Sequence, residues 1–214
     1  MEEFITILKN ETAEIVEKKS KFIANLFHVE SVEEAENRIK DVKKKYHDAR
    51  HNCIAYRVVE NGQIIEKSSD DGEPSGTAGG PMLNILQKNN LCNLVIVVTR
   101  YFGGILLGTG GLVRAYSEAT QQAIEKSTKV IKVIGREMII ELDYSNLEKF
   151  KYYCKNNNIN IKKIDYMGNI ILKIEMEESV KEKIIDDIKN KKLNIQNFSE
   201  GERKCIDKFV ENCK

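Results

Sequence analysis

The segment NLVIVVTRYFGGILLGTGGLVRAYSEA, residues 93–119, combines a strand pattern and a helix pattern around a glycine-rich loop. Residues 93–99 form a continuous apolar run, which is typical of a strand that is covered on both faces. The helix predicted over about residues 111–126 has a face of small side chains, suited to lying close against a sheet. That face consists of Leu112, Ala115, Ala119 and Ala123. The segment therefore predicts a core built from both α and β elements.

The chain before this segment also carries strand and helix patterns. Residues 12–30 alternate apolar and polar side chains, which predicts one or two strands. Ser31 and Glu34 have the spacing of a capping box, in which each side chain accepts a backbone N–H of the other residue. This box predicts a helix that runs through about residue 46.

A hairpin and another glycine-rich loop come next. Residues 52–60 and 63–69 are predicted strands, and the turn pair Asn61-Gly62 supplies the positive φ angles that a two-residue turn requires. The loop DDGEPSGTAGGP, residues 70–81, then leads into a helix predicted from about Pro81 to Lys88. Pro81 suits the first helical position, because proline lacks the N–H that would be unpaired there.

The composition changes after residue 126, where glycine becomes rare and Lys, Asn, Ile and Glu predominate. From residue 136 the patterns follow the order βαββαβ, which is that of a ferredoxin-like domain. Its last strand is predicted near residues 193–198, and the charged tail after Ser199 is left without an element. Two capping boxes are predicted to start its helices: Ser145 with Glu148, and Ser179 with Glu182. We therefore predict an α+β protein with two domains, residues 1–132 and 136–214.

Charge restricts the classes of partner. The 214 residues include 34 basic and 33 acidic side chains, for a net charge of +1, whereas nucleic-acid-binding domains usually carry a basic excess. RNA binding would therefore need a local patch, and we expect no DNA partner. The clearest basic cluster is followed by Arg50 and His51, and its ordinary interpretation is a solvated helix face. The cluster consists of Lys40, Lys43, Lys44 and Lys45.

Other features argue against a membrane protein, a secreted protein and a zinc protein. No stretch approaches the roughly 20 apolar residues of a membrane-spanning helix. The start, MEEFITILKN, carries two acids where a secretory signal would carry bases. The five cysteines are scattered and never form CxxC, which argues against a disulfide framework and a zinc site. We expect a cytoplasmic protein with no membrane partner, and no motif identifies a cofactor.

The loop after residue 99 contains candidate ligand-binding residues. A helix N-terminus carries about half a positive charge and free N–H donors, so it favours an anion such as phosphate. Arginines on both sides of the loop can hold an anion bidentately, and a tyrosine beside an arginine can stack on a base. Thr109 is the predicted N-cap of the helix. The candidates are Arg100, Tyr101, Gly108, Thr109, Gly110, Gly111 and Arg114.

The loop of residues 70–81 adds carboxylates and hydroxyls to the candidates, namely Asp70, Asp71, Glu73, Ser75 and Thr77. Carboxylates repel phosphate unless a cation lies between them, so these residues also allow an alternative enzyme function. In it, a phosphotransferase or hydrolase would bind Mg²⁺ here and a nucleotide at the other loop. The nucleotide motif GxxxxGK[ST] is absent, and GxGxxG is matched only with Val113 in its last position. No catalytic residue is identified.

The glycines have a purely structural interpretation as well, since tight strand-to-helix turns need positive φ angles or close backbone approach. The two interpretations differ in geometry. If the loops bind a ligand, we predict that they meet at one end of the N-terminal sheet. Gly79, Gly103 and Gly104 would then be packed, and a cleft would be lined by Glu73, Thr77, Arg100 and Arg114.

Four segments resemble the YigZ/IMPACT family of translation-associated proteins. They are KSKFIA (residues 19–24), HNCIAYR (51–57), DDGEPSGTAG (70–79) and VVTRYFGGILLGTGGLVRAYSEA (97–119). The resemblance covers nearly the whole chain. One difference is Gly80, at a position where the family often has a bulkier or basic residue, so this position supplies no charge here.

The resemblance implies a fold and a function. It implies an N-terminal domain similar to domain IV of elongation factor G and to the GHMP kinases, and a C-terminal domain similar to domain V of that factor. The eukaryotic relatives act in translational control, by competing for the activator of an amino-acid-starvation kinase. The leading hypothesis is a non-catalytic regulator that binds RNA, the ribosome or a translation-control protein through a phosphate-binding cleft. The phosphotransferase or hydrolase and a protein–protein adaptor, which would fit the near-neutral charge, are the alternatives.

Overall fold

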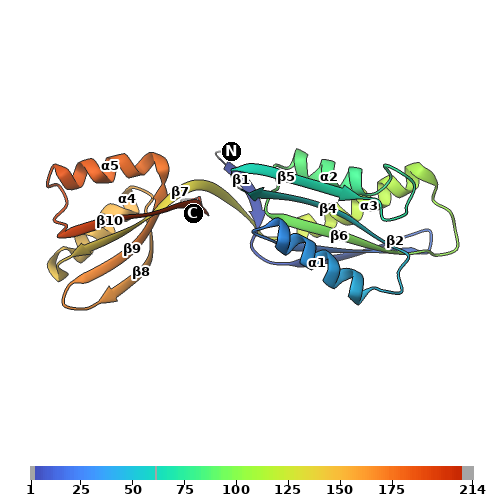
Figure 1. Cartoon of the computed structure of the whole chain (residues 1–214), viewed down its shortest axis with the longest axis horizontal. Helices are drawn as coiled ribbons and strands as arrows, with labels where there is room; N and C mark the ends of the chain where they lie inside the picture. The colour runs from blue at the N-terminus through green and yellow to red at the C-terminus, as the bar shows by residue number, and fades with distance from the viewer. Residues whose placement is uncertain (1–2, 61, 209–214) are drawn as a thin grey trace. The chain divides into compact units, whose positions relative to one another are not determined.

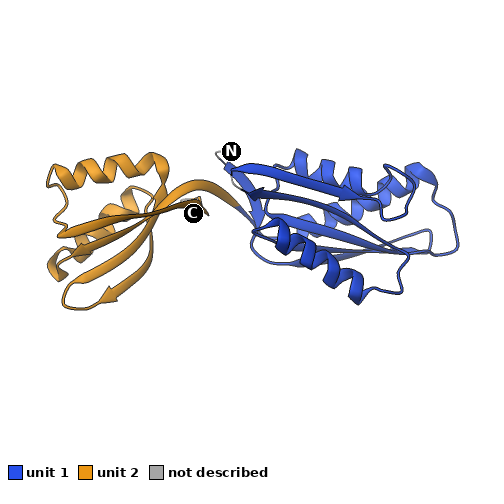
Figure 2. Cartoon of the chain, in the orientation of Figure 1, with its two compact units in different colours: residues 1, 3–130 blue, residues 2, 131–214 orange. Residues whose placement is uncertain are grey.

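The computed structural model describes residues 3–60 and 62–208. The chain forms two compact units, unit 1 over residues 3–130 and unit 2 from residue 131 onward (Figure 2). Both units combine sheets with helices, so the α+β, two-domain prediction is confirmed. Within the described ranges, no helix is long and apolar enough to cross a membrane.

Unit 1 is built on an antiparallel sheet with the strand order β2-β3-β6-β4-β5. Its strands are β2 (Glu11–Glu17), β3 (Ser20–His28), β4 (His51–Glu60), β5 (Gln63–Ser69) and β6 (Leu94–Tyr101). The apolar run predicted as a doubly covered strand is β6, in the centre of the sheet, and its first seven residues are buried. The predicted hairpin is β4–β5. Gly62 in its turn has φ +77°, and Asn61 lies outside the described residues.

Helices cover both faces of this sheet, which explains why β6 is apolar on both sides (Figure 1). Helix α1 (Val32–Lys45) packs on one face through Ala35, Ile39 and Val42. Helices α2 (Gly79–Lys88) and α3 (Gly108–Lys126) pack on the other face. The predicted small-residue face of α3 is buried there. A short strand, β1 (Glu3–Ile7), precedes the sheet and was not predicted from the sequence.

The helix starts in unit 1 differ in detail from the prediction. Ser31 caps α1 by accepting a hydrogen bond from the Glu34 N–H, but the Glu34 carboxylate accepts from Glu30 rather than from Ser31. Helix α2 begins at Gly79, so the placement of Pro81 at the first position is wrong. The prediction of Thr109 as an N-cap is also wrong. Gly108 has φ +70° and turns the chain into α3 one residue earlier.

Unit 2 has the predicted βαββαβ order, and its strands lie in the order β10-β7-β9-β8 with antiparallel neighbours. This is the ferredoxin-like arrangement. The elements are β7 (Lys129–Leu142), which begins at the end of unit 1, then a 3₁₀ turn (Tyr144–Asn146), α4 (Leu147–Asn156), β8 (Asn160–Tyr166), β9 (Ile170–Glu177), α5 (Glu178–Lys189) and β10 (Asn197–Asp207).

Three predictions for unit 2 are wrong. Ser145 lies in the 3₁₀ turn, and Ser179 lies inside α5, so neither is the predicted cap. The last strand begins at Asn197, later than predicted, and the tail that had no assigned element forms most of it. The register shifts between Glu200 and Arg203, and such a bulge interrupts the alternation by which a strand is recognised in a sequence.

Candidate functional site

The two glycine-rich loops meet in one cleft of unit 1, which has a volume of about 460 Å³. Four segments line it: residues 50–51 at the start of β4, residues 72–74, the end of β6 with Phe102, and residues 106–109 with Leu112 at the start of α3. The predicted convergence of the loops is therefore confirmed. Small-molecule sites usually have about 300–1,000 Å³, so the cleft is large enough for a ligand group.

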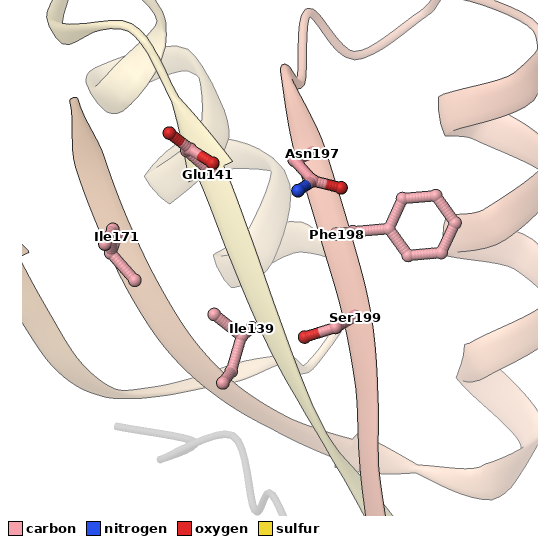
Figure 3. A pocket seen from close by; sticks show the side chains of 6 residues that line it. All are labelled: Ile139, Glu141, Ile171, Asn197, Phe198 and Ser199. Carbon is pink, nitrogen blue, oxygen red and sulfur yellow. The ribbon is translucent and has the colours of Figure 1, made fainter.

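Unit 2 has a groove on the face of its sheet, but it is much smaller. Its volume is about 80 Å³, and it lies between β7, β9 and β10 (Figure 3). Ile139 and Ile171 form its apolar part, and Phe198 points away from it toward the helices. This groove is too small to enclose a ligand, so the cleft of unit 1 is the candidate site.

The floor of the cleft is a buried ion pair. Glu73 Oε1 accepts hydrogen bonds from Arg100 Nη1 and from the Tyr116 hydroxyl, each at 2.8 Å. The side chains of Arg100 and Glu73 are only 7% and 3% exposed. The Arg100 guanidinium also lies 5.5 Å from the ring centres of Phe22 and Phe102. The charge of Arg100 is thus neutralised inside the protein rather than offered to a ligand.

Cys53 lies beside this network but is not a candidate nucleophile. Burial raises the pKa of its thiol to about 12, whereas the reactive form of cysteine is the thiolate. The thiol donates a hydrogen bond to the Asp70 carbonyl at 3.0 Å. Burial also raises the pKa of Tyr116, so this hydroxyl stays protonated and acts as the donor to Glu73.

Asp70 caps the start of α2. One carboxylate oxygen accepts the N–H groups of Ala78 and Gly79 at 3.0 and 2.8 Å, and the other accepts that of Gly76 at 2.8 Å. Burial raises the pKa of Asp70, but these three N–H groups outweigh that effect and hold the pKa below its ordinary value. The anion at this helix N-terminus is therefore the protein's own carboxylate, and Asp70 does not line the cleft.

We expect the Asp70→Ala substitution to lower the free energy of unfolding at pH 7 by about 2 kcal/mol, because it removes a charged cap with three hydrogen bonds. The folded-state pKa of Asp70 is depressed, so its contribution is fully present above the unfolded pKa of about 3.9. It is lost as the pH falls through the folded pKa. Urea denaturation of protein and variant at several pH values would measure this.

The matched control is Asp70→Asn, which keeps one acceptor oxygen without the charge. Its effect should be smaller than that of Asp70→Ala. A stability difference for Asp70→Ala that stays constant between pH 7 and pH 3 would show that the carboxylate charge contributes nothing.

Asp71 connects the cleft to α1. Its carboxylate accepts from Lys43 Nζ and from the Asn52 N–H, both at 2.7 Å. Its carbonyl lies 2.9 Å from His51 Nδ1. A carbonyl can only accept, so Nδ1 carries the hydrogen and the neutral ring keeps Nε2 as an acceptor. His51 therefore enters the cleft with a fixed tautomer.

The carboxylates proposed as Mg²⁺ ligands are engaged in contacts within the protein. Asp70 binds backbone N–H groups, Asp71 binds Lys43 and Asn52, and Glu73 binds Arg100 and Tyr116. Within residues 3–60 and 62–208, no group of three or more His, Cys, Asp or Glu side chains is placed to hold a metal ion. The Mg²⁺-dependent alternative therefore gains no support from the geometry.

Several predicted site residues lie outside the cleft. Thr77 is buried and donates to the Pro74 carbonyl at 2.6 Å. Tyr101 donates to Asp48 at 2.7 Å, and this hydrogen bond raises the pKa of Tyr101 to about 12. Ser75 and Gly110 are exposed and do not line the cleft, and neither Asp70 nor Asp71 lines it. Of the three glycines expected to be packed, Gly79 is buried and Gly103 fits tightly against backbone, but Gly104 is exposed.

Arg114 and Gly111 line a separate pocket of about 330 Å³, together with Glu17, Lys18 and Glu118. The prediction that Arg114 lines the cleft is therefore wrong. Leu112 faces the cleft. Arg114 comes two residues later in the helix, which corresponds to a rotation of about 200° around the helix axis, so its side chain lies on another side.

Arg50, His51 and Phe102 line the cleft, although sequence reasoning did not assign them to it. The sequence block HNCIAYR, which begins at His51, indicated that this region is important, but the sequence did not show which strand lies beside it. In the sheet, His51 lies opposite Arg100 in the register of β4 and β6. The basic last turn of α1 is tied to the same region, because Lys43 binds Asp71.

Comparison with known proteins places both units in described families. The family of the Impact N-terminal domain matches residues 18–124, and a domain of unknown function, DUF1949, matches residues 140–191. The IMPACT family member YvyE of Bacillus subtilis is 37% identical over 214 residues, with 99% of this chain and 97% of the relative covered. The IMPACT family member YigZ of Escherichia coli is 38% identical over 164 residues, with 74% and 78% covered. A solved crystal structure of a hypothetical protein aligns with a TM-score of 0.62 at 32% identity, over 91% of this chain and 97% of that chain.

Proposed function

This chain belongs to the IMPACT family, and we propose that it is a translation regulator that binds single-stranded RNA of the translation machinery at the cleft of unit 1. In this proposal the protein works in the cytoplasm, where its RNA partner is the ribosome or a bound transcript. It acts by binding rather than by chemistry. Two observations support a binding role: the Cys53 thiol stays protonated, and the Glu73 carboxylate is held in an ion pair with Arg100.

The observation that carries the proposal is an exposed aromatic ring at a cleft with basic residues. Phe102 is 54% exposed and lines the cleft, and the buried Arg100 guanidinium makes a cation–π contact with its ring. Stacking of a base on an exposed aromatic side chain contributes about 1–3 kcal/mol. Leu106 and Pro74 add apolar surface beside the ring. The cleft thus offers a place for one nucleobase.

Groups that favour phosphate lie at the same cleft. Arg50 is exposed, and its guanidinium can donate to a phosphate. Helix α3 begins at Gly108 without any side-chain cap, so its first N–H groups are available to an anion. The start of α2 is filled by Asp70, so only one of the two predicted phosphate-binding helix starts remains.

We expect Arg50→Ala to weaken the binding of a fluorescein-labelled ten-nucleotide oligouridylate by about 5- to 10-fold at 50 mM salt. It should also reduce the slope of log affinity against log salt by about 0.7, because one phosphate contact to a single strand is lost. Phe102→Ala should weaken binding by about 10-fold or more with an unchanged slope, because stacking releases no counterions. Fluorescence anisotropy over a salt series measures both effects.

Arg114→Ala is the matched control, since this arginine is exposed like Arg50 but belongs to α3 and lines the other pocket. Its affinity should equal that of the unmodified protein. Equal losses for Arg50→Ala and Arg114→Ala would indicate diffuse attraction and no site in the cleft. Absence of oligouridylate binding and of ribosome co-sedimentation at 50 mM salt would refute the proposed function itself.

A further inference from the structure

Unit 2 carries tyrosines whose rings are largely exposed. Tyr144, Tyr152 and Tyr166 are 55%, 67% and 62% exposed, and the neighbouring Met167 is 66% exposed. The chain has eight tyrosines, and the other five are buried or half-buried. The three exposed ones all lie between residues 144 and 166, so the exposure is concentrated in a single segment.

Two of these tyrosines form a fixed pair. The ring centres of Tyr144 and Tyr166 are 6.5 Å apart, with 39° between the ring planes. The Tyr144 hydroxyl donates to the Met167 carbonyl at 2.7 Å, which ties the 3₁₀ turn before α4 to the turn after β8. An aromatic surface held in place in this way loses little conformational entropy when a partner stacks on it.

The same segment is basic, although the whole chain is nearly neutral. Residues 144–166 contain five lysines and two acids, a net charge of +3, whereas the whole chain carries +1. Three of the five lysines already form ion pairs, namely Lys151 with Glu148, Lys163 with Asp165 and Lys162 with Glu175. The charge that can act on a partner is therefore chiefly that of the other two, Lys149 and Lys155.

Lys149 and Lys155 lie on either side of the third exposed tyrosine, Tyr152, in the sequence of α4. Lys149, Tyr152 and Lys155 are spaced three residues apart on α4, which puts them on one face of the helix, and all three are exposed. Helix α4 packs beside β8, and β8 ends at Tyr166. The exposed face of α4 thus belongs to a helix that packs against the strand of Tyr166.

We propose that this side of unit 2, formed by Tyr144, Tyr166, Met167 and the α4 face of Lys149, Tyr152 and Lys155, is a second binding surface for single-stranded RNA. Bases stack on the Tyr144–Tyr166 pair and the phosphates lie along the lysines of α4, which is the usual division of roles on single-strand-binding surfaces. Exposed tyrosines also occur at protein interfaces, but the local excess of positive charge favours a polyanion. The inference stands on the residues of unit 2 and does not require the cleft of unit 1.

The test uses the full chain and two double variants of the surface, Tyr144→Ser/Tyr166→Ser and Lys149→Ala/Lys155→Ala. The matched control is Lys183→Ala/Lys189→Ala, which removes two exposed lysines with the same six-residue spacing from α5. Each is measured by anisotropy with the ten-nucleotide oligouridylate in the Arg50→Ala/Phe102→Ala background, so that the cleft of unit 1 does not mask the binding to unit 2. We expect at least a 10-fold loss for the tyrosine variant, about a 5-fold loss for the α4 lysine variant, and no change for the α5 control.

Photocrosslinking to 4-thiouridine RNA, with the modified peptides identified by mass spectrometry, separates the two sites. Crosslinks at Tyr144 or Tyr166 support the inference, even where the cleft variants have no effect and the proposed function of unit 1 fails. Crosslinks confined to unit 1, with surface variants that bind as the unmodified protein does, overturn the inference and leave the cleft standing. An RNA that binds neither unit overturns both, and the tyrosines are then a surface for a protein partner.

Discussion

Arg100→Met is expected to lower the free energy of unfolding by about 3–5 kcal/mol, because it leaves the buried Glu73 carboxylate without its counter-charge. The Arg100 and Glu73 side chains are 7% and 3% exposed, so water cannot replace the guanidinium. Only the Tyr116 hydroxyl would still donate to the carboxylate. Denaturation in urea, followed by circular dichroism since the chain has no tryptophan, measures the loss.

Two further variants test the reason for this loss. Lys21→Met removes the same kind of charge from the exposed pair with Glu14, whose side chains are 43% and 48% exposed, and should change stability by at most about 1 kcal/mol. Arg100→Met/Glu73→Gln removes both charges but keeps an oxygen for Tyr116, and should recover most of the lost stability. If the double variant were as unstable as Arg100→Met, packing rather than charge would explain the effect.

Gly103→Ala should destabilise unit 1 by at least about 3 kcal/mol, at the upper end of overpacking effects. A Cβ at this position would lie 2.0 Å from the Lys19 carbonyl carbon and 2.4 Å from the Ser20 nitrogen. These are backbone atoms of the β2–β3 turn and cannot move aside as a side chain can. The shift would also break the hydrogen bond from the Gly103 N–H to Ser20 Oγ. Thermal melting would show the loss.

Gly110→Ala, seven residues later in the same glycine-rich segment, should have the opposite effect. A Cβ added there would have no atom within 4 Å beyond the neighbouring backbone, the φ of Gly110 is not positive, and the residue belongs to the first turn of α3. Alanine there should stabilise the protein by about 0.5–1 kcal/mol, through its higher helix propensity. Similar melting temperatures for the two alanine variants would contradict the assignment of Gly103 as a packing glycine.

The parts of the fold that were predicted correctly depend on local patterns. The apolar run of β6, the turn with Gly62 and the small-residue face of α3 each follow from neighbours in the sequence. The start of α2 does not follow from neighbouring residues. Its cap, Asp70, lies nine residues before Gly79, and a carboxylate in a glycine-rich loop has the same appearance in a sequence whether it caps a helix or binds a metal.

The cleft was only partly predictable for a similar reason. The meeting of the two loops followed from the expected strand end and helix start, but the identity of the lining residues depends on register and rotation. His51 reaches the cleft because β4 pairs with β6 in the register that sets it opposite Arg100. Arg114 misses it because of its position around α3. Neither the register of distant strands nor the orientation of a helix can be deduced from one sequence.

The position of β6 has a consequence for how unit 1 folds during synthesis. The chain completes β3, β4 and β5 before β6, yet β6 lies between β3 and β4. The hairpins β2–β3 and β4–β5 can form early, because each joins strands that are adjacent in the chain. Until β6 leaves the ribosome, however, β3 and β4 each keep an unpaired edge, and such edges invite pairing with other chains. The nascent protein therefore holds two separate half-sheets, and the aggregation risk from the β3 and β4 edges ends only when this one strand inserts between them.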